Sequence, residues 1–232
     1  MTRYDTYRAG QQTVTTRFPP LEASLRFLES QQDAHFDVVG RLCGAPSGHD
    51  TVPLFEIDVV LLSVLNRSLD LVDGFRATFD RWNLTSAAPQ VRMQVDNLLR
   101  LNLVLLAPPN TVAKLLLSGE RMSRHVDPLA PPGSKVKLTD HRLREHARPY
   151  FPWLDRVYEN ASAWVHFSGT HVGVTMNLED EGASVFGRFP SDIGVYPYDF
   201  LEQVLWAMNE TTAGILQIAN DFAIGKEQAR RK

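Results

Sequence analysis

The sequence contains one cysteine, Cys43, in 232 residues. A single thiol excludes an intramolecular disulfide and any metal site built from several cysteines. A chain without disulfides suits a reducing compartment, so we expect a cytoplasmic protein. No stretch approaches the roughly 18 consecutive apolar residues that a membrane-spanning helix needs. The polar first 18 residues also lack the apolar core of a signal peptide, so we expect no membrane association.

Charge is scarce as well. Charged residues make up 22% of the chain, the formal net charge is -3, and the sequence pI is near 6.2. This balance argues against a surface that is basic throughout, although it leaves room for a local basic patch. Hydrophobic residues make up 44% of the sequence, which is enough for a sizeable core in one large domain or two small ones.

Apolar residues recur at helical spacing over most of the chain. Two seams with alternating steps of four and three residues run from Leu21 to Leu42 and from Leu201 to Phe222, as in helix-packing interfaces. His35 interrupts the first seam and is expected to be a hydrogen-bonded core histidine. The sequence therefore predicts a mainly α fold, a bundle of six or seven helices. The expected helical ranges are 20–42, 54–82, 91–106, 110–122, 139–149, 154–167 and 198–225.

The periodicity changes after Gly169. Val172, Val174 and Met176 alternate with small or polar residues, and a second short run follows a turn-like segment. We expect one inserted two-stranded β-hairpin near 171–189, packed against helices because an isolated hairpin is marginally stable. The predicted organisation is an irregular N-terminal arm (1–18), a single helical domain (19–225) and a charged tail (226–232).

Two of the predicted helices carry ordered polar lines. Residues at i, i+4 and i+8 lie on one face of a helix, and each line follows this spacing. If the two helices pack together, Asp96 could orient His166 while an arginine binds an anion. The same side chains could instead form a buried polar network that fixes the helix register. The candidate ligand-binding residues are Arg92, Asp96, Arg100, Tyr158, Ser162 and His166.

A basic cluster precedes the second polar line. It is either a phosphate-binding patch or a solvated helix face. His166 and His171 have no evident third ligand, so the sequence predicts neither a metal site nor a cofactor. The cluster consists of His141, Arg142, Arg144, His146 and Arg148.

A helix bearing the Arg92–Asp96–Arg100 line, followed by a helix ending in Ser162-Ala-Trp-Val-His166-Phe-Ser168, resembles a group of bacterial all-helical proteins. Their bundles are similar to the HEPN (higher eukaryote and prokaryote nucleotide-binding) superfamily, and the resemblance covers roughly residues 54–171. Many HEPN proteins are ribonucleases of toxin or phage-defence systems, so the resemblance implies a nucleotide- or RNA-directed role.

The superfamily's catalytic pattern is an arginine followed by a histidine after four to six residues. This sequence departs from it, because Arg142 and His146 are separated by three residues and Arg156 and His166 by nine. We therefore assign no catalytic residue, and whether the protein is an enzyme stays open.

The leading hypothesis is a helical binding or regulatory module whose polar cleft accepts an anionic ligand, either a nucleotide or RNA. One alternative is a metal-independent ribonuclease or hydrolase that uses His166 with Asp96. Another is a structural dimerising protein with no ligand. The two helix seams offer more apolar surface than a single chain is expected to cover, so the sequence also predicts a homodimer.

Overall fold

A computed structural model describes residues 12–44, 54–165, 176–178, 185–187 and 196–230. Among these residues, no helix is long and apolar enough to cross a membrane. The helices are α2 (Val14–Arg17), α3 (Pro20–Cys43), α4 (Glu56–Phe79), α5 (Leu84–Leu101), α6 (Leu103–Leu106), α7 (Pro109–Leu117), the 3-10 turn η1 (Met122–Arg124), α8 (Asp140–Ala147), α9 (Leu154–Val165) and α11 (Tyr198–Arg230).

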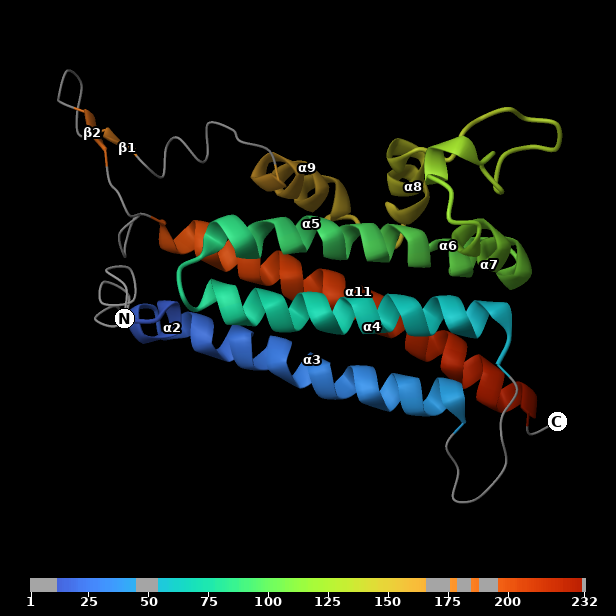
Figure 1. The fold of residues 1–232 in the computed structure, drawn as a ribbon, viewed down its shortest axis with the longest axis horizontal. Coiled ribbons are helices and arrows are strands. Elements are labelled where there is room, and N and C mark those ends of the chain that lie inside the picture. Colours follow the sequence, from blue (N-terminus) through green and yellow to red (C-terminus); the bar gives the residue numbers. More distant parts are fainter. Residues whose placement is uncertain (1–11, 45–53, 166–175, 179–184, 188–195, 231–232) are drawn as a thin grey trace.

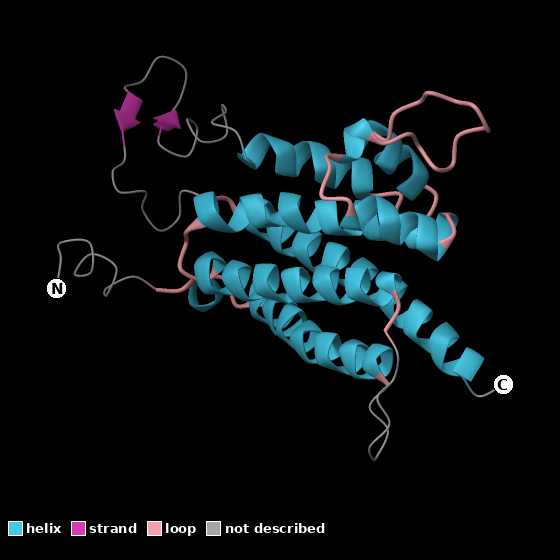
Figure 2. Ribbon diagram, turned by 45° about the vertical axis from the view of Figure 1, so that its right-hand side comes forward, coloured by secondary structure: helices cyan, strands magenta, loops and turns pink. Residues whose placement is uncertain are grey.

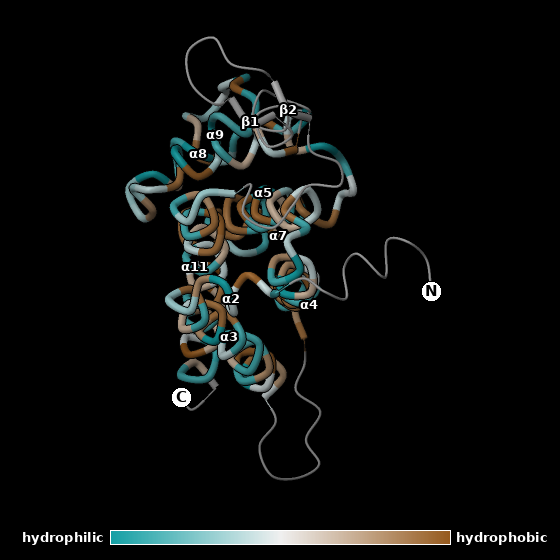
Figure 3. The backbone as a smooth tube through the Cα atoms, turned by 90° about the vertical axis from the view of Figure 1, so that its left-hand side faces the viewer, coloured by the Kyte–Doolittle hydropathy of each residue, from teal (hydrophilic) through white to brown (hydrophobic). Residues whose placement is uncertain are grey.

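Helix α5 lies in the middle of the molecule. On one side it packs on α4 and α11, which with α3 complete a four-helix bundle, and on the other side α8 and α9 cover it (Figure 1). The end-on view in Figure 3 shows this order of layers. Val91, Val95, Leu98 and Leu99 of α5 are fully buried. Polar side chains on this helix must therefore find partners within the protein or at its edges.

The two predicted seams pack against each other. Helices α3 and α11 form the most extensive pair in the fold. Leu21, Leu28 and Leu42 of α3 and Leu205 and Ala219 of α11 are buried in one shared core. Each seam is thus covered within the same chain, so neither seam supplies the surplus apolar surface from which we predicted a homodimer, and the homodimer stays a prediction.

The predicted fold class needs correction, because the packed body of the protein is all-helical. The expected hairpin near 171–189, packed against helices, is wrong as an element of this body. Within that range the structure describes only β1 (Met176–Leu178) and β2 (Val185–Gly187), an antiparallel pair of three residues each. The pair lies apart from the helices (Figure 2). Strands this short bury too little surface to form a layer, and the alternating residues Val172 and Val174 lie outside the described residues.

The helical segments also differ from the prediction around α5. The expected break at Thr85–Pro89 is wrong, because the helix already begins at Leu84. The Asn83 side chain accepts a hydrogen bond from the Ser86 N–H at 3.3 Å and caps this start. Pro89 lies near the N-terminus of α5, where its missing N–H removes a single helical hydrogen bond. The helix then ends at Leu101, and the predicted continuation to Leu106 is the separate turn α6.

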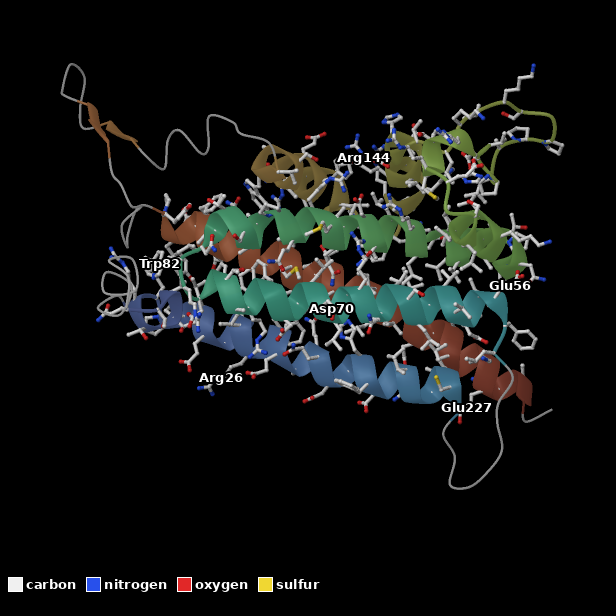
Figure 4. All side chains as sticks on the ribbon, in the orientation of Figure 1. Arg26, Glu56, Asp70, Trp82, Arg144 and Glu227 are labelled. Carbon is white, nitrogen blue, oxygen red and sulfur yellow. The ribbon has the colours of Figure 1, made fainter. Side chains whose placement is uncertain are left out.

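The described part of the N-terminal arm is ordered against the bundle. Val14 is fully buried, and its N–H donates to the Asp80 carbonyl at 3.0 Å. Thr15 donates to the Asp80 carboxylate through its N–H at 3.0 Å and its hydroxyl at 2.8 Å. Trp82, labelled in Figure 4, has a φ of 63° and donates from Nε1 to the Gln12 carbonyl at 2.9 Å. These bonds hold a left-handed residue in the α4–α5 turn.

A buried ion pair closes the opposite end of the bundle. Lys226 of α11 pairs with Asp58 of α4 and donates to the Leu42 carbonyl of α3 at 3.3 Å. The Asp58 side chain is fully buried. Lys226 follows Gly225, where the sequence predicted that α11 ends, yet the helix continues to Arg230. The pair explains the extension, because it joins this last part of α11 to the ends of two other helices.

Candidate functional site

Arg92 joins α5 to α9. Its Nε donates to Ser162 Oγ at 3.2 Å, and its Nη2 donates to the Tyr158 hydroxyl at 2.7 Å. Its Nη1 pairs with the Asp96 carboxylate one turn along α5. The guanidinium carbon lies 4.0 Å from the centroid of the Tyr158 ring. The structure thus brings four of the six predicted site residues into contact around Arg92, and Arg100 contacts Asp96 in turn.

Helix α8 adds two residues that the sequence did not single out for this site. Asp140 accepts from the Tyr158 hydroxyl at 3.0 Å and from Arg92 Nη2 at 3.3 Å. The Arg144 guanidinium carbon lies 4.4 Å from the Tyr158 ring centroid, and Arg144 is labelled between α8 and α9 in Figure 4. The Tyr158 ring therefore contacts two guanidinium groups. Two sequence signals pointed toward them: the i, i+4 spacing of Asp140 and Arg144, and the position of the basic cluster directly before the second polar line.

We call Arg92, Asp96, Asp140, Tyr158 and Ser162 the Arg92 network. Burial lowers the pKa of Arg92, but the hydrogen bond and charge of Asp96, helped by Tyr158 and Asp140, raise it above its ordinary value. Four of the five guanidinium N–H groups point at these protein acceptors. Burial raises the pKa of the Tyr158 hydroxyl, which therefore stays protonated and acts as a donor to Asp140. The network is an arrangement for holding helices together.

Arg100 and Arg67 form the outer part of the site, which we call the rim. Arg100 donates from Nη1 to the Asp96 carbonyl at 2.9 Å and lies 3.3 Å from its carboxylate, with 31% of its side chain exposed. Arg67, an exposed residue of α4, reaches inward to the Asn97 side chain and to the Met93 carbonyl at 3.4 Å. Burial lowers the pKa of Arg67, the charge of Asp96 raises it, and the charge of Arg100 lowers it further. The charge of Asp96 therefore favours the Arg67 cation more than the charge of Arg100 opposes it.

Arg67 was absent from the predicted site because it lies in the helix predicted over 54–82, which carries neither of the two polar lines. His166, the sixth predicted residue, lies outside the described residues, as does His171. The Asp96 carboxylate, its expected partner, is engaged by both Arg92 and Arg100.

The basic cluster of α8 is largely paired with carboxylates. Asp127, whose side chain is fully buried, accepts from Arg142 at 3.1 and 3.2 Å and lies 2.8 Å from His146 Nε2. Burial acts to raise the pKa of Asp127, but the Leu129 N–H, His146 and Arg142 together lower it. Arg148 donates to Asp155 of α9 at 2.7 Å. These bonds pin the segment before α8, and α8 itself, in place.

The described residues contain no group of three or more His, Cys, Asp or Glu side chains placed to hold a metal ion. Comparison with family models, curated proteins and solved structures gives no match to this chain. The chemistry of the site therefore has to be inferred from its own residues.

Proposed function

We propose that this protein is a helical binding or regulatory module that accepts an anionic ligand, a nucleotide or RNA, at the rim formed by Arg67 and Arg100. The observation that carries the proposal is the number of cations around Asp96. Arg92 and Arg100 both pair with its carboxylate, and its charge also acts on Arg67. A phosphate at the rim would add negative charge and accept charge-assisted hydrogen bonds from Arg67 and Arg100.

The charge of the surrounding elements supports an anion on this side of the molecule. Residues 84–165, which include α5, α8 and α9, carry eleven Arg and Lys against seven Asp and Glu. Helix α11 carries two basic residues against five acidic ones, and α3 and α4 each carry two against four, although α4 contributes Arg67 to the rim. An uneven distribution of this kind attracts anions toward the basic half.

Within this proposal the predicted site residues have two roles. Arg92, Tyr158 and Ser162 hold α9 on α5, and Asp96 orients Arg100 through its carbonyl and carboxylate. Arg67 and Arg100 contact the ligand. The resemblance to HEPN bundles favours a nucleotide or RNA over a small carboxylate, because ligands of that class are what the resemblance implies.

The test is a titration of labelled single-stranded RNA and of ATP into the wild type and three variants. Arg67→Gln and Arg100→Gln should each weaken binding about tenfold, the loss of one charge-assisted contact. Arg26→Gln is the matched control, since Arg26 is an exposed α3 residue paired with Glu22 at 2.6 Å, and it should bind like the wild type. Binding should also weaken as salt rises.

A folded wild type that binds neither probe at low salt would rule the proposal out. Equal losses in all three variants would also contradict it, because they would reflect general charge and not the rim. RNA cleavage in the same tubes would favour the hydrolase alternative.

A further inference from the structure

A chain of polar side chains crosses the core of the bundle from the rim to α3. The Asn97 side-chain oxygen accepts from Arg67, and Asn97 Nδ2 donates to Gln94 Oε1 at 3.1 Å. Gln94 Nε2 donates to Ser68 Oγ at 2.6 Å, and Ser68 Oγ lies 2.9 Å from His35 Nε2. The four inner residues, His35, Ser68, Gln94 and Asn97, are at most 3% exposed. Together with Arg67 they form what we call the core chain.

The two ends of the core chain fix the direction of every bond in it. His35 Nδ1 lies 2.6 Å from the Gln31 carbonyl, which can only accept, so Nδ1 carries the proton of the neutral ring. Nε2 must then accept from the Ser68 hydroxyl, and Ser68 in turn accepts from Gln94. At the other end, the Arg67 guanidinium can only donate. Each donor therefore points from the rim toward His35.

A second proton on His35 would reverse the inner part of the core chain. Nε2 would become a donor to Ser68. Among the described contacts of the Ser68 hydroxyl, Gln94 is then the one partner that can offer an acceptor, so the hydroxyl hydrogen turns toward Gln94. The Gln94 amide would then rotate to present its oxygen, and its NH₂ group would face Asn97. Asn97 would rotate in the same way. Its NH₂ group would then face the Arg67 guanidinium, and two donors cannot bond to each other.

We propose that protonation of His35 releases Arg67 from Asn97 by concerted rotation of the Gln94 and Asn97 amides. The protonation state of His35 in the core then controls whether the Arg67 guanidinium at the rim is bonded to Asn97. Thr212 of α11 allows the rotation. It now accepts from Gln94 at 3.0 Å and donates to the Met208 carbonyl, and its hydroxyl can turn to donate to the rotated Gln94 oxygen. The core rearrangement does not depend on a ligand, whereas its effect on binding rests on the function proposed above.

The surroundings of His35 make it suited to this role. The groups that the described contacts place around it, and around Ser68 and Gln94, are neutral: Gln31 on its own helix, Ser68 on α4, Gln94 and Asn97 on α5, and Thr212 on α11. The Arg67 cation contacts Asn97 at the far end of the core chain. Burial lowers the pKa of His35, the hydrogen bond to Gln31 raises it, and no charged side chain in the described part of the chain contributes. No neighbouring carboxylate therefore holds the ring in its charged form.

The first experiment follows the side-chain nitrogens by NMR between about pH 8 and about pH 5. In the wild type, the amide signals of Gln94 and Asn97 should change with the same midpoint as the His35 imidazole. Ser68→Ala cuts the core chain and should leave both amides unchanged while His35 still titrates. Ser63→Ala is the matched control, since Ser63 is an exposed residue of the same helix that bonds only to the Val59 carbonyl, and it should behave like the wild type.

The second experiment measures sulfate affinity at the two ends of this pH range, because sulfate keeps its charge throughout. The wild type and Ser63→Ala should gain at least about threefold in affinity at the lower pH relative to Ser68→Ala. The comparison with Ser68→Ala removes the general effect of protonating surface histidines. Equal pH dependence in all three proteins would overturn the link to the rim.

The two proposals fail in different ways. Constant amide signals through the His35 titration would overturn the core rearrangement, as would cooperative unfolding before His35 gains its proton. Coupled amide signals in a protein that binds no sulfate at any pH would leave the rearrangement standing and remove the anion-binding function.

Discussion

The core chain and the Arg92 network both tie α5 to its neighbours, yet they are built from different chemistry. The inner core chain uses amides, a hydroxyl and an imidazole, all at most 3% exposed. The Arg92 network uses ions, and its Arg92 and Asp96 side chains are 14% and 24% exposed. Dehydrating a charge costs far more than dehydrating a hydrogen-bonded neutral group. Along α5, charge therefore lies where water still reaches and neutral groups lie where it does not.

Asp58 and Lys226 are an exception to this division. Their side chains are 0% and 9% exposed, so this ion pair lies inside the bundle. The exception is limited to the end of the bundle, where Lys226 also bonds to the Leu42 carbonyl and Asp58 accepts from the Phe55 N–H at 2.7 Å. Exposure and charge together should determine how much the free energy of unfolding falls when a polar side chain loses its hydrogen-bond or ion-pair partner.

The largest effect is expected at this exception. Lys226→Met would leave the Asp58 carboxylate buried without its cation, and the free energy of unfolding should fall by about 3 to 5 kcal/mol. Asp58→Asn combined with Lys226→Met should recover part of the loss, because no buried charge remains. Urea denaturation of the three proteins measures both changes. A loss below about 1 kcal/mol for Lys226→Met would mean that water reaches Asp58.

A smaller effect is expected in the core chain. Gln94→Leu keeps the side-chain volume but leaves the Asn97 NH₂ group without its acceptor, at a cost of about 2 to 3 kcal/mol. The control is Gln217→Leu on an exposed position of α11, which should change stability by no more than about 0.5 kcal/mol. Equal denaturation midpoints for the two variants would show that the core chain contributes nothing to stability.

Removing one charged partner from the Arg92 network should lower the free energy of unfolding less than the changes in the bundle core. Asp96→Asn removes the charge that Arg92 and Arg100 share, but Arg92 keeps Asp140, Tyr158 and Ser162 as acceptors. We expect a destabilisation of about 1 kcal/mol that shrinks as salt rises, since the pair is partly exposed. Denaturation at low and high salt tests this. A loss as large as that of Lys226→Met would contradict the comparison.

The smallest effect concerns pH. Burial lowers the pKa of His35 below its ordinary value of 6.5. Between the lowered value and 6.5, the unfolded chain binds a proton that the folded chain excludes. The free energy of unfolding should therefore decrease as the pH falls through this window, and the full contribution is present above it. His35→Gln should show a flatter dependence than the wild type when denaturation midpoints are compared across the window.

Local signals in the sequence predicted much of the fold. The predicted range 20–42 matches α3 to within a residue, and the predicted start at residue 139 matches the start of α8 at Asp140 to within a residue. The prediction that His35 is a hydrogen-bonded core histidine is confirmed. Gly225 was misleading, because the tertiary pair between Lys226 and Asp58 continues the helix past it.

The site was predicted only in part, for a physical reason. Helical spacing places Arg92 and Asp96 on one face, and likewise Tyr158 and Ser162, so their meeting could be expected wherever the two helices pack. Arg67 and Asn97 belong to different helices, and neither helix alone indicates that one bonds to the other. Periodicity describes one helix at a time, whereas the rim depends on how α4 and α5 are rotated toward each other.

The pairing of α3 with α11 also has a consequence for biosynthesis. These helices span Pro20–Cys43 and Tyr198–Arg230, so about 150 residues separate the two halves of the most extensive interface. At roughly 5 to 20 residues per second, a ribosome needs roughly 8 to 30 seconds to make the intervening chain. During that time the apolar stripe from Leu21 to Leu42 has no α11 to cover it. The nascent chain therefore exposes this apolar stripe until α11 is made, and slower translation lengthens the exposure.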